Sequence, residues 1–419
     1  MLKKQIGTLF KYKTKLNCVL DSAITLLFGV LFFSIPVCSF TPKLNAVTWI
    51  IAIIFTVLIV IDIFFFYKIK IDFINISLLL FCVTSVISSG LNGFKNFTFT
   101  YVLMTIFIVI IYTFCSINKT ITKPLLISAF FGIVFFLVVY LVKYRSELLS
   151  FNFDRLGGLF GDENDIAIFN SLGAILCLYF LFFNKNLWVK ILSFLLTLLF
   201  SFAAISSGSK IVFVLLFMTI LAIVFFLNGK KRWWLSLAVV VAVIALFTLI
   251  LSLPFASNLK ERILSMLNLF TNSQLSGAQT NDLSTIDRIL MFSNGIEMFA
   301  RKPLFGFGIN GFANFGGINN GWSHNHISEI LCNTGSIGFL LYHIPVVYSF
   351  YCFTKSEQKR EIFIYFIILL FFIISMLSIA LAGEKMFAFI IGIIYSSLTK
   401  TPSYYEIRFR KIKTVYENS

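Results

Sequence analysis

The chain has 419 residues, of which 59% are hydrophobic and only 12% are charged. This composition excludes an ordinary soluble globular domain, in which about a quarter of the residues are charged. The net charge of +16 is spread over short connections between apolar runs, so it does not indicate a nucleic-acid partner. The sequence therefore predicts an integral membrane protein.

Twelve apolar segments have the character of membrane helices, which need about 20 residues to cross roughly 30 Å of hydrocarbon. The strands of a transmembrane barrel would alternate apolar and polar residues, and these segments do not. We expect an all-α polytopic membrane protein with a single integral membrane domain over residues 1–419. The expected helices cover residues 22–40, 45–67, 73–89, 98–116, 124–142, 166–183, 187–205, 211–228, 233–253, 326–353, 362–381 and 386–399.

The distribution of basic residues predicts the topology. If the N-terminus lies in the cytoplasm, 22 of the 34 lysines and arginines fall on the cytoplasmic side, with at least two in each connection there. Cytoplasmic loops of membrane proteins carry such an excess. Both termini are therefore expected in the cytoplasm, and residues 254–325 are expected to form one large extracytoplasmic loop.

The first distinctive outward connection covers residues 144–165. Here Arg155 stands beside Gly157 and Gly158, which permit tight turns. The connection ends in a polar run of Asp162, Glu163, Asn164 and Asp165. Its carboxylates could hold a divalent cation, although solvated loop carboxylates are commoner.

The second outward connection, residues 206–210, is so short that Lys210 must begin the next helix at the membrane edge. The third is the long loop. Between residues 259 and 270 its apolar residues share one helical face, which predicts a helix lying on the membrane surface, followed by a polar linker over residues 271–285.

A second amphipathic helix is expected in the long loop, from residue 285 or 286 to about residue 300. Ser284 and Asp287 have the spacing of a capping box, and Pro303 ends the helix. Arg288 lies in its first turn. A glycine-rich stretch over residues 306–321 then leads to His324.

The sequence around this loop does not support a dinucleotide, zinc or phosphate-binding motif. Gly306 to Gly311 match the dinucleotide pattern GxGxxG, but no strand precedes them. His324 and His326 lack the further ligands that a zinc site needs, and the chain has neither a nucleophile elbow nor a phosphate loop. The sequence therefore supports no metal, cofactor or nucleotide at this loop.

The expected outer face retains His324 and three cations, Arg155, Lys210 and Arg288. A histidine side chain, with an ordinary pKa of about 6.5, suits proton abstraction at neutral pH. Cations at fixed positions suit a phosphate or diphosphate. Two alternatives stay open: Arg155 and Lys210 could simply extend from helix ends to the interface, and His324 could cap the following helix.

At this point the motifs resemble a known family. His324-Asn325, nine further residues and then Gly335-Ser-Ile-Gly338 are similar to the His-Asn-x9-Gly-x-x-Gly pattern of the O-antigen ligase and Wzy-type polymerase superfamily. The segments 153–158, 207–210 and 302–308, the last preceded by Asp287-Arg288, resemble its other motifs. The family usually has arginine where this chain has Lys210, which keeps the charge but loses the forked contact.

The resemblance implies a GT-C-like, metal-independent, inverting glycosyltransferase without cofactors in the bacterial cytoplasmic membrane, with its active site facing the exterior. It favours a polymerase of polyprenyl-diphosphate-linked repeat units, in lipopolysaccharide or capsule synthesis. The alternatives are an O-antigen ligase that transfers glycan to lipid A core and, in another class, a lipid-linked oligosaccharide flippase.

The roles of residues and partners follow from the same resemblance. His324 would be the base, and Arg288, Lys210 and Arg155 would bind the diphosphate, with Arg288 also acting in catalysis. The partners would be the lipid-linked donor, a glycan acceptor, the lipid bilayer and a chain-length regulator protein. Secondary site candidates are Asn164, Arg301, Asn325 and His326.

Overall fold

The computed structural model describes residues 2–38, 42–67, 69, 71–95, 97–150, 156, 163–227, 233–253, 257, 260, 261, 264, 283–315, 323–377 and 379–399. All regular structure in these residues is helical, which confirms the predicted all-α class. The elements are α1 (Leu2–Cys38), α2 (Pro42–Phe66), α3 (Phe73–Leu91), α4 (Thr100–Ile117), α5 (Thr122–Lys143), α6 (Arg145–Ser150), α7 (Glu163–Phe183), α8 (Leu187–Ser206), α9 (Val212–Leu227), α10 (Trp233–Leu251), α12 (Leu283–Arg301), α13 (Gly311–Phe315), α14 (His326–Lys355), α15 (Lys359–Ser375), η3 (Leu381–Gly383) and α16 (Lys385–Leu398).

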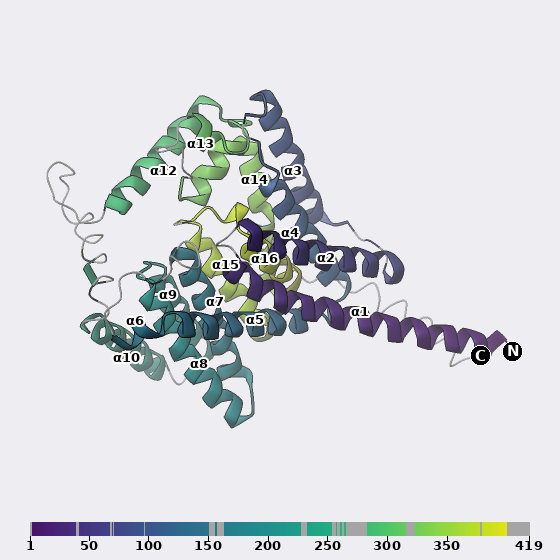
Figure 1. Cartoon of the computed structure of the whole chain (residues 1–419), viewed down its shortest axis with the longest axis horizontal. Coiled ribbons are helices and arrows are strands. Elements are labelled where there is room, and N and C mark those ends of the chain that lie inside the picture. The colour runs from purple at the N-terminus through teal and green to yellow at the C-terminus, as the bar shows by residue number, and fades with distance from the viewer. Residues whose placement is uncertain are drawn as a thin grey trace.

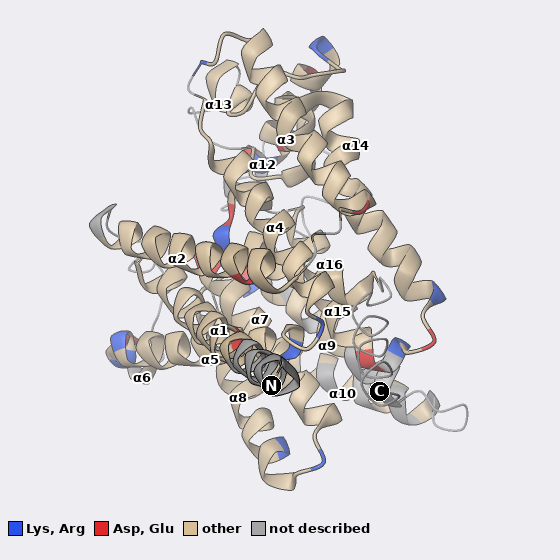
Figure 2. Ribbon diagram, turned by 90° about the vertical axis from the view of Figure 1, so that its right-hand side faces the viewer, with Lys and Arg blue, Asp and Glu red and all other residues tan. Residues whose placement is uncertain are grey.

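Each predicted membrane segment coincides with a helix. Within the described residues, eight helices, α1 to α5, α7, α8 and α14, are long and apolar enough to cross a membrane, so the chain is a multi-pass membrane protein. Helices α9, α15 and α16 have 16, 17 and 14 residues, which at a rise of about 1.5 Å per residue is less than a hydrocarbon core of about 30 Å. The count of twelve spans stays a prediction. Most Lys and Arg lie at helix ends and in connections (Figure 2).

Several helix boundaries differ from the prediction, and three of the differences concern α1, α15 and α12. The first helix begins at Leu2 because the basic N-terminal segment continues into the apolar one. Helix α15 ends at Ser375 and not near residue 381, since the carbonyls that follow it bind the start of α14. Helix α12 covers the second amphipathic helix of the long loop from Leu283, two residues earlier than expected. The predicted surface helix over residues 259–270 lies almost wholly outside the described residues.

Small residues allow α1 and α5 to pack backbone to backbone. A Cβ atom added to Gly132 would overlap the carbonyl oxygen of Gly29, and one added to Gly29 would lie 2.6 Å from Ser128 Oγ. Close packing over small side chains is a common way for helices to associate in a membrane, where water no longer drives them together. The sequence spacing of apolar residues alone does not reveal this contact.

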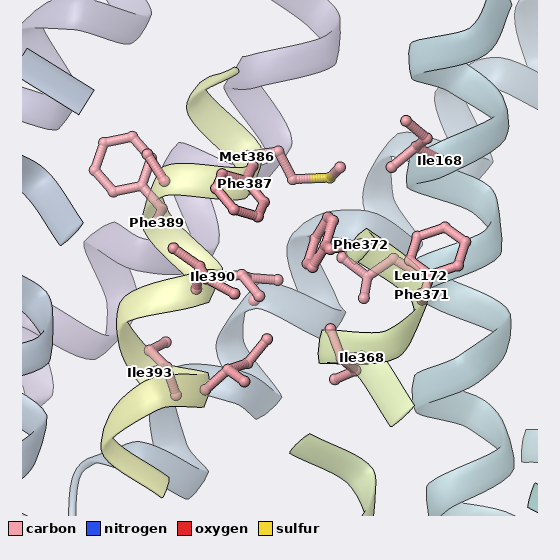
Figure 3. Packing of buried hydrophobic residues seen from close by; sticks show 14 of the residues in the cluster. Ile168, Leu172, Ile368, Phe371, Phe372, Met386, Phe387, Phe389, Ile390 and Ile393 are labelled. Carbon is pink, nitrogen blue, oxygen red and sulfur yellow. The ribbon is translucent and has the colours of Figure 1, made fainter. Parts of the chain in front are cut away.

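Larger apolar side chains fill the centre of the molecule, where α7, α15 and α16 meet (Figure 3). Leu172 of α7 lies against Phe371 and Phe372 of α15 in this view, and Phe372 meets Phe387 of α16 edge to face at 5.2 Å. All four side chains are buried. The last two long helices, α15 and α16, are thereby fixed against α7.

Contacts at the helix ends indicate how the chain alternates between two faces. At one face, which we call the motif end, Leu156 N–H donates to the Ser206 carbonyl at 3.0 Å, and the ends of α1, α8 and α15 meet the starts of α7, α14 and α16. At the opposite end, Tyr112 Oη donates to Asp72 Oδ2 at 2.5 Å and Asn118 Nδ2 donates to Asp21 Oδ1 at 3.0 Å. This separation agrees with alternating crossings; which end faces outward stays a prediction.

Figure 1 shows α12 and α13 beside α3 and α14 at one side of the molecule. The view in Figure 2 shows the same grouping. The described part of the long outer loop therefore rests on the helix that begins just after His324.

Candidate active site around His324

The start of α14 presents His324 on a fixed backbone. Asn325 is the N-cap of the helix, because its Oδ1 accepts hydrogen bonds from Ile327 N at 3.0 Å and Ser328 N at 3.1 Å. His324 is half-buried and has a φ of 50°, in the left-handed region that residues other than glycine rarely adopt. The helix cap is therefore Asn325 and not His324, and the histidine occupies a backbone conformation often found at functional sites.

The end of α15 holds the same segment from the other side. His326 N donates to the Met376 carbonyl at 2.9 Å, and Asn325 Nδ2 donates to the Leu377 carbonyl at 3.2 Å. The N-cap residue and the first residue of α14 are thus bound to the segment that directly follows α15. This arrangement limits the positions that the His324 backbone can take.

A buried carboxylate, Glu329, completes this support. It is 1% exposed. One of its oxygens accepts from Ser323 N at 2.8 Å and the other from Asn333 Nδ2 at 3.0 Å. Burial of a charged group is unfavourable unless it is hydrogen-bonded, so these donors are required. The carboxylate fixes the residue directly before His324. Sequence reasoning missed it, although an acidic residue at the start of an apolar helix was a usable signal.

We expect Glu329→Gln to lower both activity and stability. An amide has a single acceptor oxygen, so Ser323 N or Asn333 Nδ2 loses its partner, at a cost of about 1–3 kcal/mol. Thermal unfolding of the purified variant and its glycan-transfer rate measure the two effects.

Glu297→Gln is the matched control for this change. Glu297 forms an exposed i,i+4 ion pair with Arg301, and such pairs contribute only about 0.3–0.5 kcal/mol. If both variants unfold and react alike, Glu329 does not position His324.

Gly335 interrupts α14 and creates a docking point for the outer loop. Its φ of 67° and ψ of −169° are not helical. The backbone N–H and carbonyl groups next to this break form hydrogen bonds with the turn that follows α12. Ser336 N donates to the Pro303 carbonyl at 2.8 Å, while Phe307 N and Gly308 N donate to the carbonyls of Cys332 and Asn333, each at 2.8 Å. The glycine of the histidine motif therefore has a structural role, since it joins the His324 helix to the 303–308 turn.

The C-terminal end of α3 supports this turn from the other side. Ser88 Oγ donates to the Asn333 carbonyl at 2.8 Å, and Ile309 N donates to Ser89 Oγ at 3.0 Å. Asn92 Nδ2 donates to the Gly306 carbonyl at 3.2 Å. The formal dinucleotide pattern thus lies in a packed turn between α3 and α14. Ser85, Ser88 and Ser89, one turn apart on an apolar helix, were the available sequence signal for this contact.

Helix α12 runs parallel to α14 and carries Arg288. A Cβ atom added to Gly295 would lie 2.9 Å from Ser328 Cβ, and Met298 Sδ lies 3.8 Å from Cys332 Sγ. Arg288 precedes Gly295 by seven residues, which places it on the same helix face about 10 Å back along the axis. Because α12 and the first part of α14 are aligned in this way, the half-buried Arg288 lies toward the start of α14, where His324 is found. Arg301, at the far end of α12, is 67% exposed and paired with Glu297.

The structure brings the short connection before Lys210 together with the start of α7. Ser209 Oγ donates to Asn164 Oδ1 at 2.7 Å, and both side chains are buried. This bond fixes the residue before Lys210, whose own side chain is half-buried. Arg155 lies outside the described residues; the next residue, Leu156, is bound to Ser206 as described above.

His326 has a different environment from His324. It is fully buried, its ring lies 5.1 Å from Tyr342 and 5.6 Å from His343, and its ring nitrogens have no hydrogen-bond partner. This placement indicates a packing residue. Among the described residues, no three His, Cys, Asp or Glu side chains form a metal-binding group; Asp162 lies outside them.

The fold and the site together define a polytopic membrane protein with a histidine presented at the start of a broken helix and cations on neighbouring elements. Residues 195–343 match the family model described as O-antigen ligase. This match includes Lys210, Arg288 and the whole histidine motif, and it confirms the resemblance to the O-antigen ligase and polymerase superfamily. A comparison with curated proteins finds no match.

Proposed function

We propose that the protein is a membrane glycosyltransferase that polymerises glycan repeat units carried on a polyprenyl diphosphate. The observation that carries this proposal is the fixed, half-buried His324 at the start of α14, inside the region that matches the O-antigen ligase family. The multi-pass helical fold supports a substrate that stays in the bilayer. The family's action on lipid-linked glycans supports the reaction type.

In the proposed reaction, a ring nitrogen of His324 accepts the proton of an acceptor hydroxyl. The hydroxyl oxygen forms a bond to the anomeric carbon, whose bond to the diphosphate oxygen breaks and leaves its electron pair on that oxygen. Attack from the opposite side inverts the anomeric carbon. His324 then gives its proton to solvent.

The cations would stabilise the leaving group. Negative charge develops on the departing diphosphate, and cations fixed in advance stabilise such charge most in a site that excludes water. Lys210 is fixed through Ser209 and Asn164, and Arg288 through the packing of α12 on α14. Arg155 is proposed as a third contact on the resemblance alone.

Substitutions of Arg288 and Lys210 should show whether each residue binds the diphosphate through a bidentate contact or through a single charged group. Arg288→Lys should lose roughly a factor of ten or more in rate because a bidentate contact becomes a single one. Lys210→Arg should keep or raise activity, since arginine is usual in the family. Initial rates with saturating donor measure both. A Lys210→Arg enzyme that is as impaired as Lys210→Ala would contradict the proposed diphosphate contact.

The product pattern distinguishes a polymerase from a ligase, the activity that the description of the matching family model names. Purified protein given only lipid-linked repeat units should produce a ladder of longer lipid-linked chains, because a second donor molecule serves as acceptor. Gel electrophoresis and mass spectrometry of the products measure this. A ligase would stay inactive until lipid A core was added, and a flippase would move the substrate without changing its mass.

The glycan-transfer activity should persist in EDTA. If EDTA abolished the activity and a divalent cation restored it, the carboxylates of residues 162–165 would have a role in the reaction.

A further inference from the structure

A pocket opens at the motif end between the end of α1, the start of α7 and the η3–α16 junction. Its empty volume of about 660 Å³ includes the solvent-filled space at its open mouth. Apolar groups line most of it, among them Pro36, Phe169 and Met386. Figure 3 shows the Met386 side chain extending toward α7, where Ile168 lies.

Two carboxylates stand on opposite walls of this pocket. Asp165 comes from the first turn of α7 and Glu384 from the N-cap position of α16, and both are half-buried. Lys385 also lines the pocket, but its ammonium donates to Asn45 Oδ1 and lies 4.7 Å from the Trp49 ring centroid, on the α2 side. The described polar lining therefore contains two carboxylates and one ammonium, and the ammonium of Lys385 also interacts electrostatically with the neighbouring Glu384.

This charge pattern determines which ligand fits. A diphosphate would be repelled by the carboxylates, whereas hydroxyl groups donate strong hydrogen bonds to them. The apolar walls suit the C–H face of a sugar ring. A neutral saccharide meets both conditions, and the lipid-diphosphate end of the donor does not.

The pocket also lies between the two sets of motif residues. Asp165 directly follows Asn164, which binds the residue before Lys210. On the other side, Leu381 of the pocket wall lies five residues after Met376, whose carbonyl accepts a hydrogen bond from His326 N at the start of α14. A ligand in the pocket would therefore be flanked by the diphosphate-binding and histidine elements.

We propose that this pocket binds the terminal sugar of the acceptor glycan, whose hydroxyls donate to Asp165 and Glu384. The proposal rests on the glycosyltransferase function and adds the acceptor subsite to it. The carboxylates orient the saccharide and do not take part in bond making, so they are positioning residues.

Binding should be measured in protein that carries His324→Ala, so that no turnover occurs. The probe is the oligosaccharide released by mild acid from the strain's own lipid-linked glycan, titrated by calorimetry into protein in lipid nanodiscs. Adding Asp165→Asn or Glu384→Gln should weaken its binding about tenfold, because each change removes a charged acceptor. The affinity for polyprenyl diphosphate without sugar should stay the same.

A second variant keeps the charges and fills the space. A Cβ atom at Gly383, on the pocket wall, would meet only Thr100 Cγ2 at 4.0 Å, so Gly383→Leu should fold while obstructing the saccharide. Glu147→Gln is the matched control, since Glu147 is an exposed acid of α6 outside the pocket. In otherwise wild-type enzyme, the pocket variants should raise the acceptor KM more than they lower kcat.

Saccharide affinity that stays within twofold in both carboxylate variants and in Gly383→Leu would overturn the proposal, and so would an equal loss of polyprenyl diphosphate binding. This outcome is distinct from failure of the proposed function. If His324→Ala proved fully active while the oligosaccharide still depended on Asp165 and Glu384, the base assignment would fail and the subsite would stand.

Discussion

Replacing His324 with alanine should lower glycan transfer by a factor of about 10² to 10⁴, the usual contribution of a positioned general base. The loss should appear in kcat, because the acceptor and donor can still bind. Asn325, and not His324, caps α14, so the helix start and the thermal unfolding temperature should change little. A rate assay with defined lipid-linked repeat units, together with a thermal melt in detergent, measures both quantities.

His326→Phe provides the matched control two residues away. Phenylalanine keeps a ring among Tyr342 and His343 and removes two buried nitrogens that have no hydrogen-bond partner. We expect this variant to retain activity and to be at least as stable as the wild type. An inactive but folded His326→Phe protein, combined with an active His324→Ala protein, would exchange the roles assigned to the two histidines.

Gly335→Ala should destabilise the protein by about 2–5 kcal/mol, from a left-handed backbone that disfavours alanine and from steric overlap. The new Cβ atom would overlap the carbonyl of Leu304, in the turn that joins α12 to α14. Separating this turn from α14 would also release the segment that leads to His324. We therefore expect the variant to be poorly folded or, where it folds, to be inactive.

Gly93→Ala isolates the backbone contribution. Gly93 has a φ of 74°, close to that of Gly335, but a Cβ atom there would meet nothing within 4 Å. This variant should lose only about 1–2 kcal/mol and remain active. Thermal unfolding of the two proteins measures the difference. Equal melting temperatures would show that the 303–308 turn does not press against Gly335.

The sequence was sufficient to predict the helices because a membrane requires long apolar segments, and their length and composition are visible directly. The ends were less predictable. Helix α15 stops at Ser375 because the carbonyls of the residues that follow it bind the start of α14, and a contact between distant segments leaves no trace in local hydropathy. Gly29 and Gly132 show the same limit, since their role depends on which helices become neighbours.

The candidate site was predicted in part. The motifs pointed to His324, and Lys210 and Arg288 lie within the residues that match the family model, but the relative placement of the three side chains depends on tertiary packing. Glu329 was missed because a single acid in an apolar helix has many explanations until its donors are known. The bond between Ser209 and Asn164 joins segments 45 residues apart, and only the fold brings them together.

The hydrogen bonds between the C-terminal end of α3 and the 303–308 turn have a consequence for protein engineering. Ser88, Ser89 and Asn92 lie more than 100 residues before the region that matches the family, yet they hold the loop that precedes the histidine motif. A chimera that exchanges the outer loop between two relatives would leave that loop on a foreign α3. Transplanting the last turn of α3 together with the loop and α14 should preserve the graft where the loop and α14 alone would fail.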